Sequence, residues 1–168
     1  DQRELIVEWA QAGAPVDVDG DTPVMPSQEV PFLVAYDQEL SSPNFYDGER
    51  GQPDEYRCFI FDPQLTETKY LTGYEFIPDQ TEVVHHLVGY RVTAEYREAA
   101  DRKDASEDQG GWSCFGSTGL GSDEILTFWA PGTGAIQYQE GLGLEMNPGD
   151  FFVMQIHYHY DVEAPEDR

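Results

Sequence analysis

The sequence predicts an all-β domain, an antiparallel β-sandwich of the jelly-roll type, preceded by one short N-terminal helix. Aromatic residues make up 13% of the 168 residues, and strong helix formers are scarce outside a few stretches. Short apolar or alternating segments also recur between turn-forming residues. Seven such segments are expected to be the strands of the sandwich, at residues 31–36, 56–62, 68–78, 82–92, 124–132, 136–146 and 150–162.

The helix is expected over residues 4–12, where Leu5, Ile6 and Trp9 recur at helical spacing. Gly13 and Pro15 follow and supply a helix stop. The segment WAQAGAP resembles the last helix of c-type cytochrome domains, so residues 1–15 are interpreted as the tail of a preceding cytochrome-like module. The chain has no Cys-x-x-Cys-His motif, and no haem is therefore expected on it.

An acidic linker is expected at residues 16–31, which hold four acidic residues and three prolines with little apolar periodicity. The β-sandwich domain should then span residues 32–168. Within it, residues 95–111 concentrate charge and lack an apolar stripe, which predicts an exposed loop with a helical turn at its start.

The charge of the chain argues against two classes of partner. Nine Lys and Arg stand against 33 Asp and Glu, a formal net charge of −24. Such a surface repels nucleic-acid phosphates and anionic lipid headgroups, so neither is expected as a partner. The acidity also fits a strongly solvated exterior without any binding role. No apolar stretch is long enough to cross a bilayer, so no membrane span is expected.

Two cysteines are candidates for one disulfide, Cys58 in EYRCFIFD and Cys114 in GGWSCFGS. The alternative is a pair of buried free thiols. An even count in a loop-rich, acidic chain favours the disulfide, and with it a location outside the cytoplasm, in the periplasm, on the cell surface or secreted. The bridge would close a loop of 56 residues and stabilise the fold by about 4 kcal/mol.

All four histidines fall into two pairs, His85 with His86 and His157 with His159. Three convergent imidazoles with one open position suit a redox copper or a catalytic zinc. The alternative is that each pair is a set of hydrogen-bonded polar residues on a strand. Adjacent residues of a regular strand face opposite sides, so His85 and His86 can share an ion only where a bulge or a strand end redirects one of them. His157 and His159 share a face.

Several segments in order resemble the copper type II ascorbate-dependent monooxygenases, the family of the peptidylglycine α-hydroxylating and dopamine β-monooxygenases. The resemblance covers residues 54–161. It runs through DEYRCF, PDQTEVVHHLVGY, GGWSC and the long segment from EILTFW to HYHYD. The chain has only two cysteines where animal members have more, and Leu87 replaces a Met that often follows the paired histidines. These departures suggest a bacterial relative.

The resemblance implies roles for single residues. His85, His86 and His157 would bind the copper ion of the family's electron-transfer site, and Cys58 with Cys114 would form one of its disulfides. His159 would be a neighbour of the site and not a ligand. The remaining expectations concern side chains around the ligands, namely Gln155, Tyr158 and Asp79, and two residues of the core or of turns that are not ligands, namely Met146 and Met154.

The resemblance also implies a reaction. In this family, ascorbate or another one-electron donor reduces two coppers, dioxygen binds the second, and a substrate C–H bond is hydroxylated while the first copper supplies an electron. This chain would hold only the electron-supplying half and no catalytic residue beyond the ligands. It would lack the last strand of the domain and the oxygen-activating copper domain that follows.

Two other functions stay open from the sequence. The first is a non-catalytic copper-binding or electron-transfer module that serves a cytochrome. The second is a cupin-like metal-binding jelly roll, because NPGDFFVMQIHYH has the Pro-Gly and His-x-His features of a cupin strand. In that case His157 and His159 would share the metal.

Overall fold

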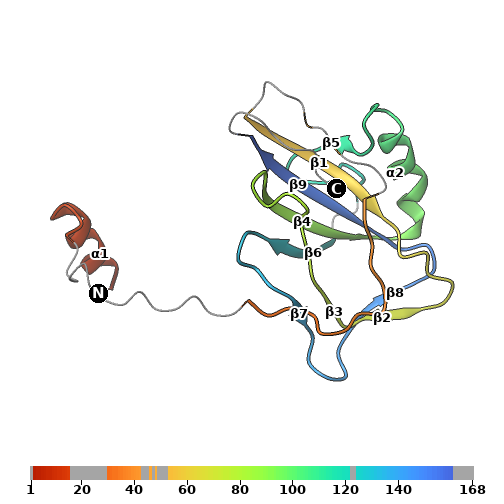
Figure 1. Ribbon diagram of the computed structural model, residues 1–168, viewed down its shortest axis with the longest axis horizontal. Helices are drawn as coiled ribbons and strands as arrows, with labels where there is room; N and C mark the ends of the chain where they lie inside the picture. The colour runs from red at the N-terminus through yellow and green to blue at the C-terminus, as the bar shows by residue number, and fades with distance from the viewer. Residues whose placement is uncertain are drawn as a thin grey trace.

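The computed structural model describes residues 2–15, 30–42, 46, 48, 53–121 and 124–160. Antiparallel strands dominate it, which confirms the predicted all-β fold with one short N-terminal helix (Figure 1). The elements are α1 (Gln2–Gln11), β1 (Asp54–Phe61), β2 (Lys69–Leu71), β3 (Gly73–Tyr74), β4 (Val84–Val92), η1 (Ala94–Tyr96), α2 (Arg97–Asp104), β5 (Trp112–Ser113), β6 (Glu124–Trp129), β7 (Ile136–Gln137), β8 (Leu144–Met146) and β9 (Phe151–His159).

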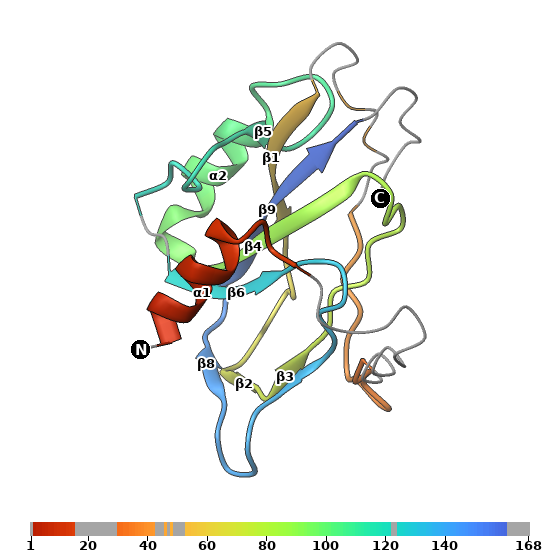
Figure 2. The same ribbon diagram turned by 90° about the vertical axis from the view of Figure 1, so that its left-hand side faces the viewer.

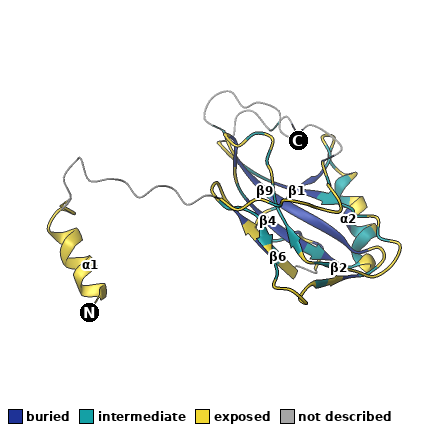
Figure 3. Ribbon diagram, turned by 60° about the horizontal axis from the view of Figure 1, so that its bottom comes forward, coloured by how far each residue is buried: buried dark blue, intermediate teal, exposed yellow. Residues whose placement is uncertain are grey.

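The main sheet has five strands in the order β5-β1-β9-β4-β6, with β9 at its centre. β9 pairs antiparallel with β1 on one side and with β4 on the other. Its sequence, FFVMQIHYH, has almost no polar alternation, which is typical of a strand covered on both faces. Most of its residues are buried accordingly (Figure 3).

One face of the main sheet packs against the two short ribbons β2-β8 and β3-β7, which lie below it in Figure 1. Met146 of β8 joins Phe59, Leu87 and Met154 of the main sheet in one hydrophobic cluster. Of the two predicted places for these methionines, the core or a turn, both therefore lie in the core. Two layers of antiparallel strands around this cluster make the expected sandwich.

The opposite face carries a second cluster and is covered by α2 and the segment that follows it (Figure 2). Ala100 of α2 and Trp112 of β5 pack there on Val92 and Val153. The Cys58–Cys114 disulfide lies on this face and confirms the predicted bridge.

The path of the chain next to the disulfide requires a glycine. Gly111 has a φ of +64°, and a Cβ at this position would lie 2.5 Å from the carbonyl oxygen of Cys58. A larger residue would push β5 away from β1.

The prediction of a strand at residues 31–36 is wrong. Within the described residues this segment is irregular, and isolated hydrogen bonds hold it, from Ala135 N–H to the Pro31 carbonyl and from Leu33 N–H to the Glu75 carboxylate. Pro31 has no N–H to donate, and Val34 is 92% exposed, so the segment has neither a full ladder nor a buried face.

Other boundaries also differ from the prediction. The expected strands at 68–78 and 136–146 are each split into two short strands, and the loop at 95–111 begins with η1 and α2, which together are longer than one turn. Of the expected linker, residues 16–29 lie outside the described residues, as do residues 161–168. All of α1 is exposed, and no helix in the described part of the chain is long and apolar enough to cross a membrane.

Candidate metal centre

A β-bulge brings the first histidine pair onto one face of the main sheet. Val84 pairs with Tyr158 and His86 pairs with His157, so β4 has one extra residue, His85, at this point. Val84 then points into the cluster that β8 covers, whereas His86 points to the other face. The bulge supplies the redirection that two adjacent ligands on one strand need.

His157 reaches the same place from the other strand. It stands directly opposite His86, near the end of β9. The three imidazoles converge through their Nδ1 atoms, which lie 3.2 Å apart between His85 and His86, 3.1 Å between His85 and His157, and 3.2 Å between His86 and His157. His157 is buried, His86 is half-buried and His85 is exposed, so the group opens to solvent on one side.

Three mutual contacts of this kind cannot all be hydrogen bonds. A ring nitrogen carries either one N–H or one lone pair in the plane of the ring, so each Nδ1 has a single position to share between two neighbours. An ion held by nitrogens at about 2.0 Å in a tetrahedral arrangement would place them about 3.3 Å apart. The arrangement fits a metal ion bound by neutral imidazoles, with a fourth position toward solvent.

Tyr56 of β1 covers one side of the cluster. Its ring is stacked on that of His157, with the centroids 4.2 Å apart and the planes 5° from parallel. Phe115, which follows the disulfide, packs edge-on against Tyr56 at 4.7 Å and is itself 78% exposed. The three rings form a continuous aromatic contact from the cluster to the surface.

The carboxylate of Asp54 lies behind His157. One oxygen, Oδ1, is 2.9 Å from His157 Nε2 and also 2.9 Å from His159 Nδ1. Hydrogen bonds from His159 and from His157 hold the pKa of Asp54 below its usual range. Asp54 is therefore an ionised acceptor at neutral pH.

The protonation of His86 favours metal binding. Burial lowers the pKa of His86 below its ordinary value, and the nearby rings of His157 and His85 lower it further. A neutral imidazole has a lone pair to offer, so His86 is ready to bind a metal ion at neutral pH.

Four other residues singled out in the sequence make contacts outside the group of three histidines. His159 contacts Asp54 and is not among the three side chains close enough to share an ion. The Gln155 amide donates to the Ser117 carbonyl at 3.3 Å. Tyr158 stacks on Tyr46 in the cluster on the opposite face, and Asp79 accepts from the Gln80 amide at 3.1 Å.

Sequence reasoning missed Asp54 and Tyr56. The antiparallel register places Asp54 opposite His159 and Tyr56 opposite His157. Residues two apart on a strand share a face, so Asp54, Tyr56 and Cys58 all lie on the face of the sheet that carries the disulfide. What the sequence does not reveal is that β1 is the neighbour of β9.

Two comparisons bear on this centre. The family model described as "Copper type II ascorbate-dependent monooxygenase, N-terminal domain" matches residues 42–164, a range that contains the three histidines and both cysteines. A search of curated proteins finds no significant match.

Proposed function

Because the chain belongs to the copper type II ascorbate-dependent monooxygenases, through the N-terminal domain of that family, we propose that His85, His86 and His157 bind one copper ion through their Nδ1 atoms. The observation that carries the proposal is the convergence of these atoms to within 3.2 Å of one another. Imidazole nitrogen is a good ligand for copper, and no cysteine thiolate stands among the three ligands.

We further propose that the domain is the electron-supplying half of the enzyme. When bound, copper would supply one-electron redox chemistry at this centre, with ascorbate or another one-electron donor as the reductant. The protein's contribution is to hold three rings in place, with His157 fixed by the stacked ring of Tyr56 and His85 exposed toward solvent. The hydroxylation of a C–H bond would take place on an oxygen-activating copper domain, in the same chain or a separate one.

The location of the protein is proposed from its cysteines. A disulfide between Cys58 and Cys114 supports a location in the periplasm, on the cell surface or outside the cell, where thiols become oxidised. Three further assignments stay predictions: residues 1–15 as the tail of a preceding cytochrome-like module, residues 16–31 as an acidic linker, and residues 32–168 as the copper-binding domain.

A copper titration tests the ligand set. The wild-type chain should bind one copper ion, and His157→Ala and His86→Ala should each weaken binding by more than about 100-fold, beyond the range typical of groups outside the ligand shell. His159→Ala should change the affinity by no more than about tenfold. Competition with a chromogenic Cu(I) chelator measures these affinities, and ascorbate should abolish the Cu(II) electron paramagnetic resonance signal of the loaded protein.

Each rival function predicts a different pattern. In a cupin-like site, His159→Ala would be as damaging as His157→Ala, and His86→Ala would be mild. A non-catalytic partner of a cytochrome would pass electrons to that cytochrome and would not support hydroxylation with an oxygen-activating domain. A wild-type chain that binds no copper, or a His157→Ala variant that binds it undiminished, would contradict the proposal.

A further inference from the structure

The contact between Asp54 and two histidines has no role in the ligand set itself. Asp54 is the first residue of β1, and its Oδ1 lies 2.9 Å from His157 Nε2 and 2.9 Å from His159 Nδ1. We propose that Asp54 is a positioning residue of the copper site, one that fixes the orientation and the tautomer of His157 and is itself held by His159. This inference rests on the proposed copper site.

The tautomer of His157 follows from the direction of its hydrogen bond to Asp54. A carboxylate can only accept, so the proton between the two groups belongs to Nε2 of His157. A neutral imidazole with its proton on Nε2 has its lone pair on Nδ1, and Nδ1 is the atom that faces His85 and His86. Asp54 therefore selects the tautomer that can bind the metal. The alternative tautomer would turn an N–H toward the ion.

His157 is held in two perpendicular directions. Asp54 contacts the edge of the imidazole, in the plane of the ring, while Tyr56 lies flat against its face at 4.2 Å. Both come from β1, two residues apart and on the same face, opposite His159 and His157 respectively. A carboxylate behind a ligand histidine fixes its orientation and raises its basicity.

His159 completes the arrangement without touching the ion. It lies two residues after His157 on β9 and therefore on the same face. Its Nδ1 donates to the same oxygen of Asp54, which lowers the number of orientations open to the carboxylate. This explains why a second histidine follows His157 at a spacing that would also suit a ligand.

The competing interpretation is an ordinary surface contact. The side chain of Asp54 is 47% exposed, and exposed ion pairs contribute little to stability. The buried end of the contact distinguishes the two interpretations, because the side chain of His157 is only 9% exposed and its ring has little freedom once Tyr56 covers it. The effect of removing Asp54 should therefore appear in the metal site and not in the stability of the fold.

Three variants test the role of Asp54. Asp54→Ala removes the acceptor and should weaken Cu(I) binding about tenfold, at the lower end of the 10–100-fold range for such outer groups because the carboxylate is half exposed. Asp54→Asn keeps an acceptor but loses the charge, and should lose less. Glu82→Gln, the matched control, removes one charge from an exposed residue three positions before His85 and should leave affinity unchanged.

Two spectroscopic readouts separate positioning from bulk stability. Loss of the carboxylate lowers the basicity of His157, so the Cu(II)/Cu(I) potential should rise in Asp54→Ala and Asp54→Asn, and the Cu(II) electron paramagnetic resonance parameters should shift. Glu82→Gln should leave both at wild-type values. The thermal midpoints of the metal-free variants should stay close to that of the wild type. If Asp54→Ala does not fold, the potential and spectrum of Asp54→Asn decide the question.

The outcomes distinguish this inference from the proposed function. Copper binding in the wild type, together with Asp54 variants that match Glu82→Gln in affinity, potential and spectrum, would overturn the positioning role alone. A wild-type chain that binds no copper would overturn both. His159→Ala should shift the spectrum in the same direction as Asp54→Ala but by less, and a larger effect would make His159, not Asp54, the group that matters.

Discussion

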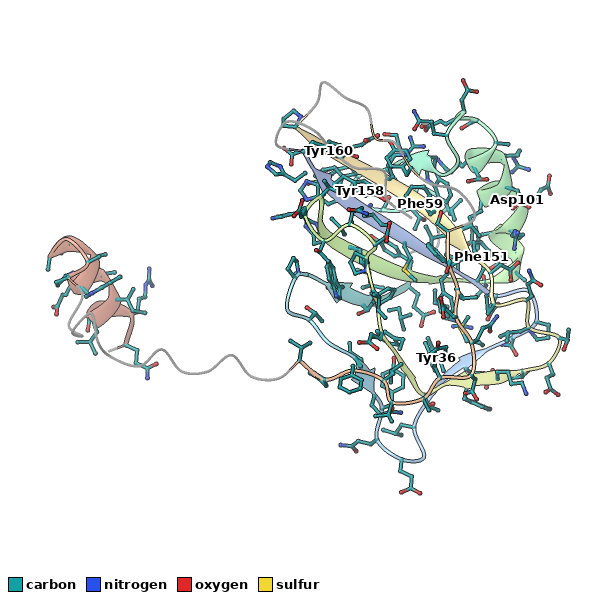
Figure 4. The ribbon with its side chains drawn as sticks, viewed as in Figure 1. Tyr36, Phe59, Asp101, Phe151, Tyr158 and Tyr160 are labelled. Carbon is teal, nitrogen blue, oxygen red and sulfur yellow. A yellow bond between two sulfur atoms is a disulfide. The ribbon has the colours of Figure 1, made fainter. Side chains whose placement is uncertain are left out.

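The two ends of the β4–β9 strand pair differ in how their polar groups are hydrogen-bonded, and Phe151 and Tyr158 mark these ends in Figure 4. At the Phe151 end, Arg91 of β4 donates to Asp150 and to Glu124, at 2.9 Å each. Asp150 also accepts the backbone N–H of Asn147 at 2.9 Å and that of Ala94 at 3.2 Å. The carboxylate that closes this end of the sheet is thus surrounded by donors.

At the other end, polar atoms meet without satisfying one another. The Nδ1 atoms of His85, His86 and His157 all lie close enough together to share one metal ion. Each Nδ1 has one position to share between two neighbours, so the three contacts cannot all be hydrogen bonds. The same strand pair is therefore anchored at one end and left chemically open at the other, which is expected where a site has a function.

The largest effect should come from the disulfide, which lies between the two ends. Cys58 stands opposite Gln155, the middle residue of β9. Replacing Cys58 and Cys114 by Ala together should lower the free energy of unfolding by about 4 kcal/mol, because the denatured chain is no longer constrained. Urea denaturation measures this loss.

The same double variant tests whether the ends are independent. Its copper affinity at low temperature, where it stays folded, should remain within about tenfold of the wild type, because neither cysteine is among the three ligands and even groups next to a metal site are typically worth only 10–100-fold. A loss as large as that of His157→Ala would mean that the bridge holds the ligands in place, and the comparison between the two ends would fail.

The next effect concerns the anchored end. Asp150→Asn should lower the free energy of unfolding by about 3 kcal/mol, since it removes the buried one of the two carboxylates that pair with a largely buried Arg91. Glu124→Gln removes the exposed partner of the same guanidinium and should cost less than about 1 kcal/mol. Copper affinity should be unchanged in both, and a loss of binding in Asp150→Asn would show that the two ends communicate.

The stability difference at Asp150 should depend on pH in a defined direction. Burial raises the pKa of Asp150, but hydrogen bonds from Asn147, Arg91 and Ala94 more than offset this, so the pKa lies below its ordinary value. The pKa of Asp150 is lower in the folded chain than in the unfolded chain, where it is about 3.9. Its ionised carboxylate therefore stabilises the fold at pH values above about 3.9. The gap between wild type and Asp150→Asn should therefore be full above about pH 5 and shrink as the pH falls below 4.

The sequence predicts the central strands better than the periphery, for physical reasons. The segment of β9 begins with four apolar residues, 151–154, and the segment of β4 is bounded by turns. The segment at 31–36 has the same apolar composition, yet Phe32, Val34 and Tyr36 are all largely exposed. Composition does not say whether a partner strand exists, and here the segment makes only isolated hydrogen bonds.

The candidate site could likewise be predicted only in part from the sequence. The spacing of the histidines and the family resemblance single out His85, His86 and His157, and the need for a bulge at the pair follows from the two-residue period of a strand. Asp54 could not be found this way, because it lies 103 residues from His157 and meets it only through the β1–β9 register. Asp79, close to the pair in the sequence, instead accepts from Gln80.

The smallest change in stability should come from a substitution at the bulge itself, where a metal ligand and a core residue are neighbours in the sequence. His85 is exposed and stands outside the regular pairing, so His85→Ala should change the free energy of unfolding of the metal-free protein by less than about 0.5 kcal/mol. Its neighbour Val84 is 2% exposed, and Val84→Ala should cost about 2 kcal/mol. Copper affinity should respond in the reverse order, falling sharply in His85→Ala and little in Val84→Ala. Denaturation and copper competition on the same two proteins give all four values. If His85→Ala were the more destabilising of the two, His85 would contribute to the stability of the sheet, and the bulge would have a structural role apart from metal binding.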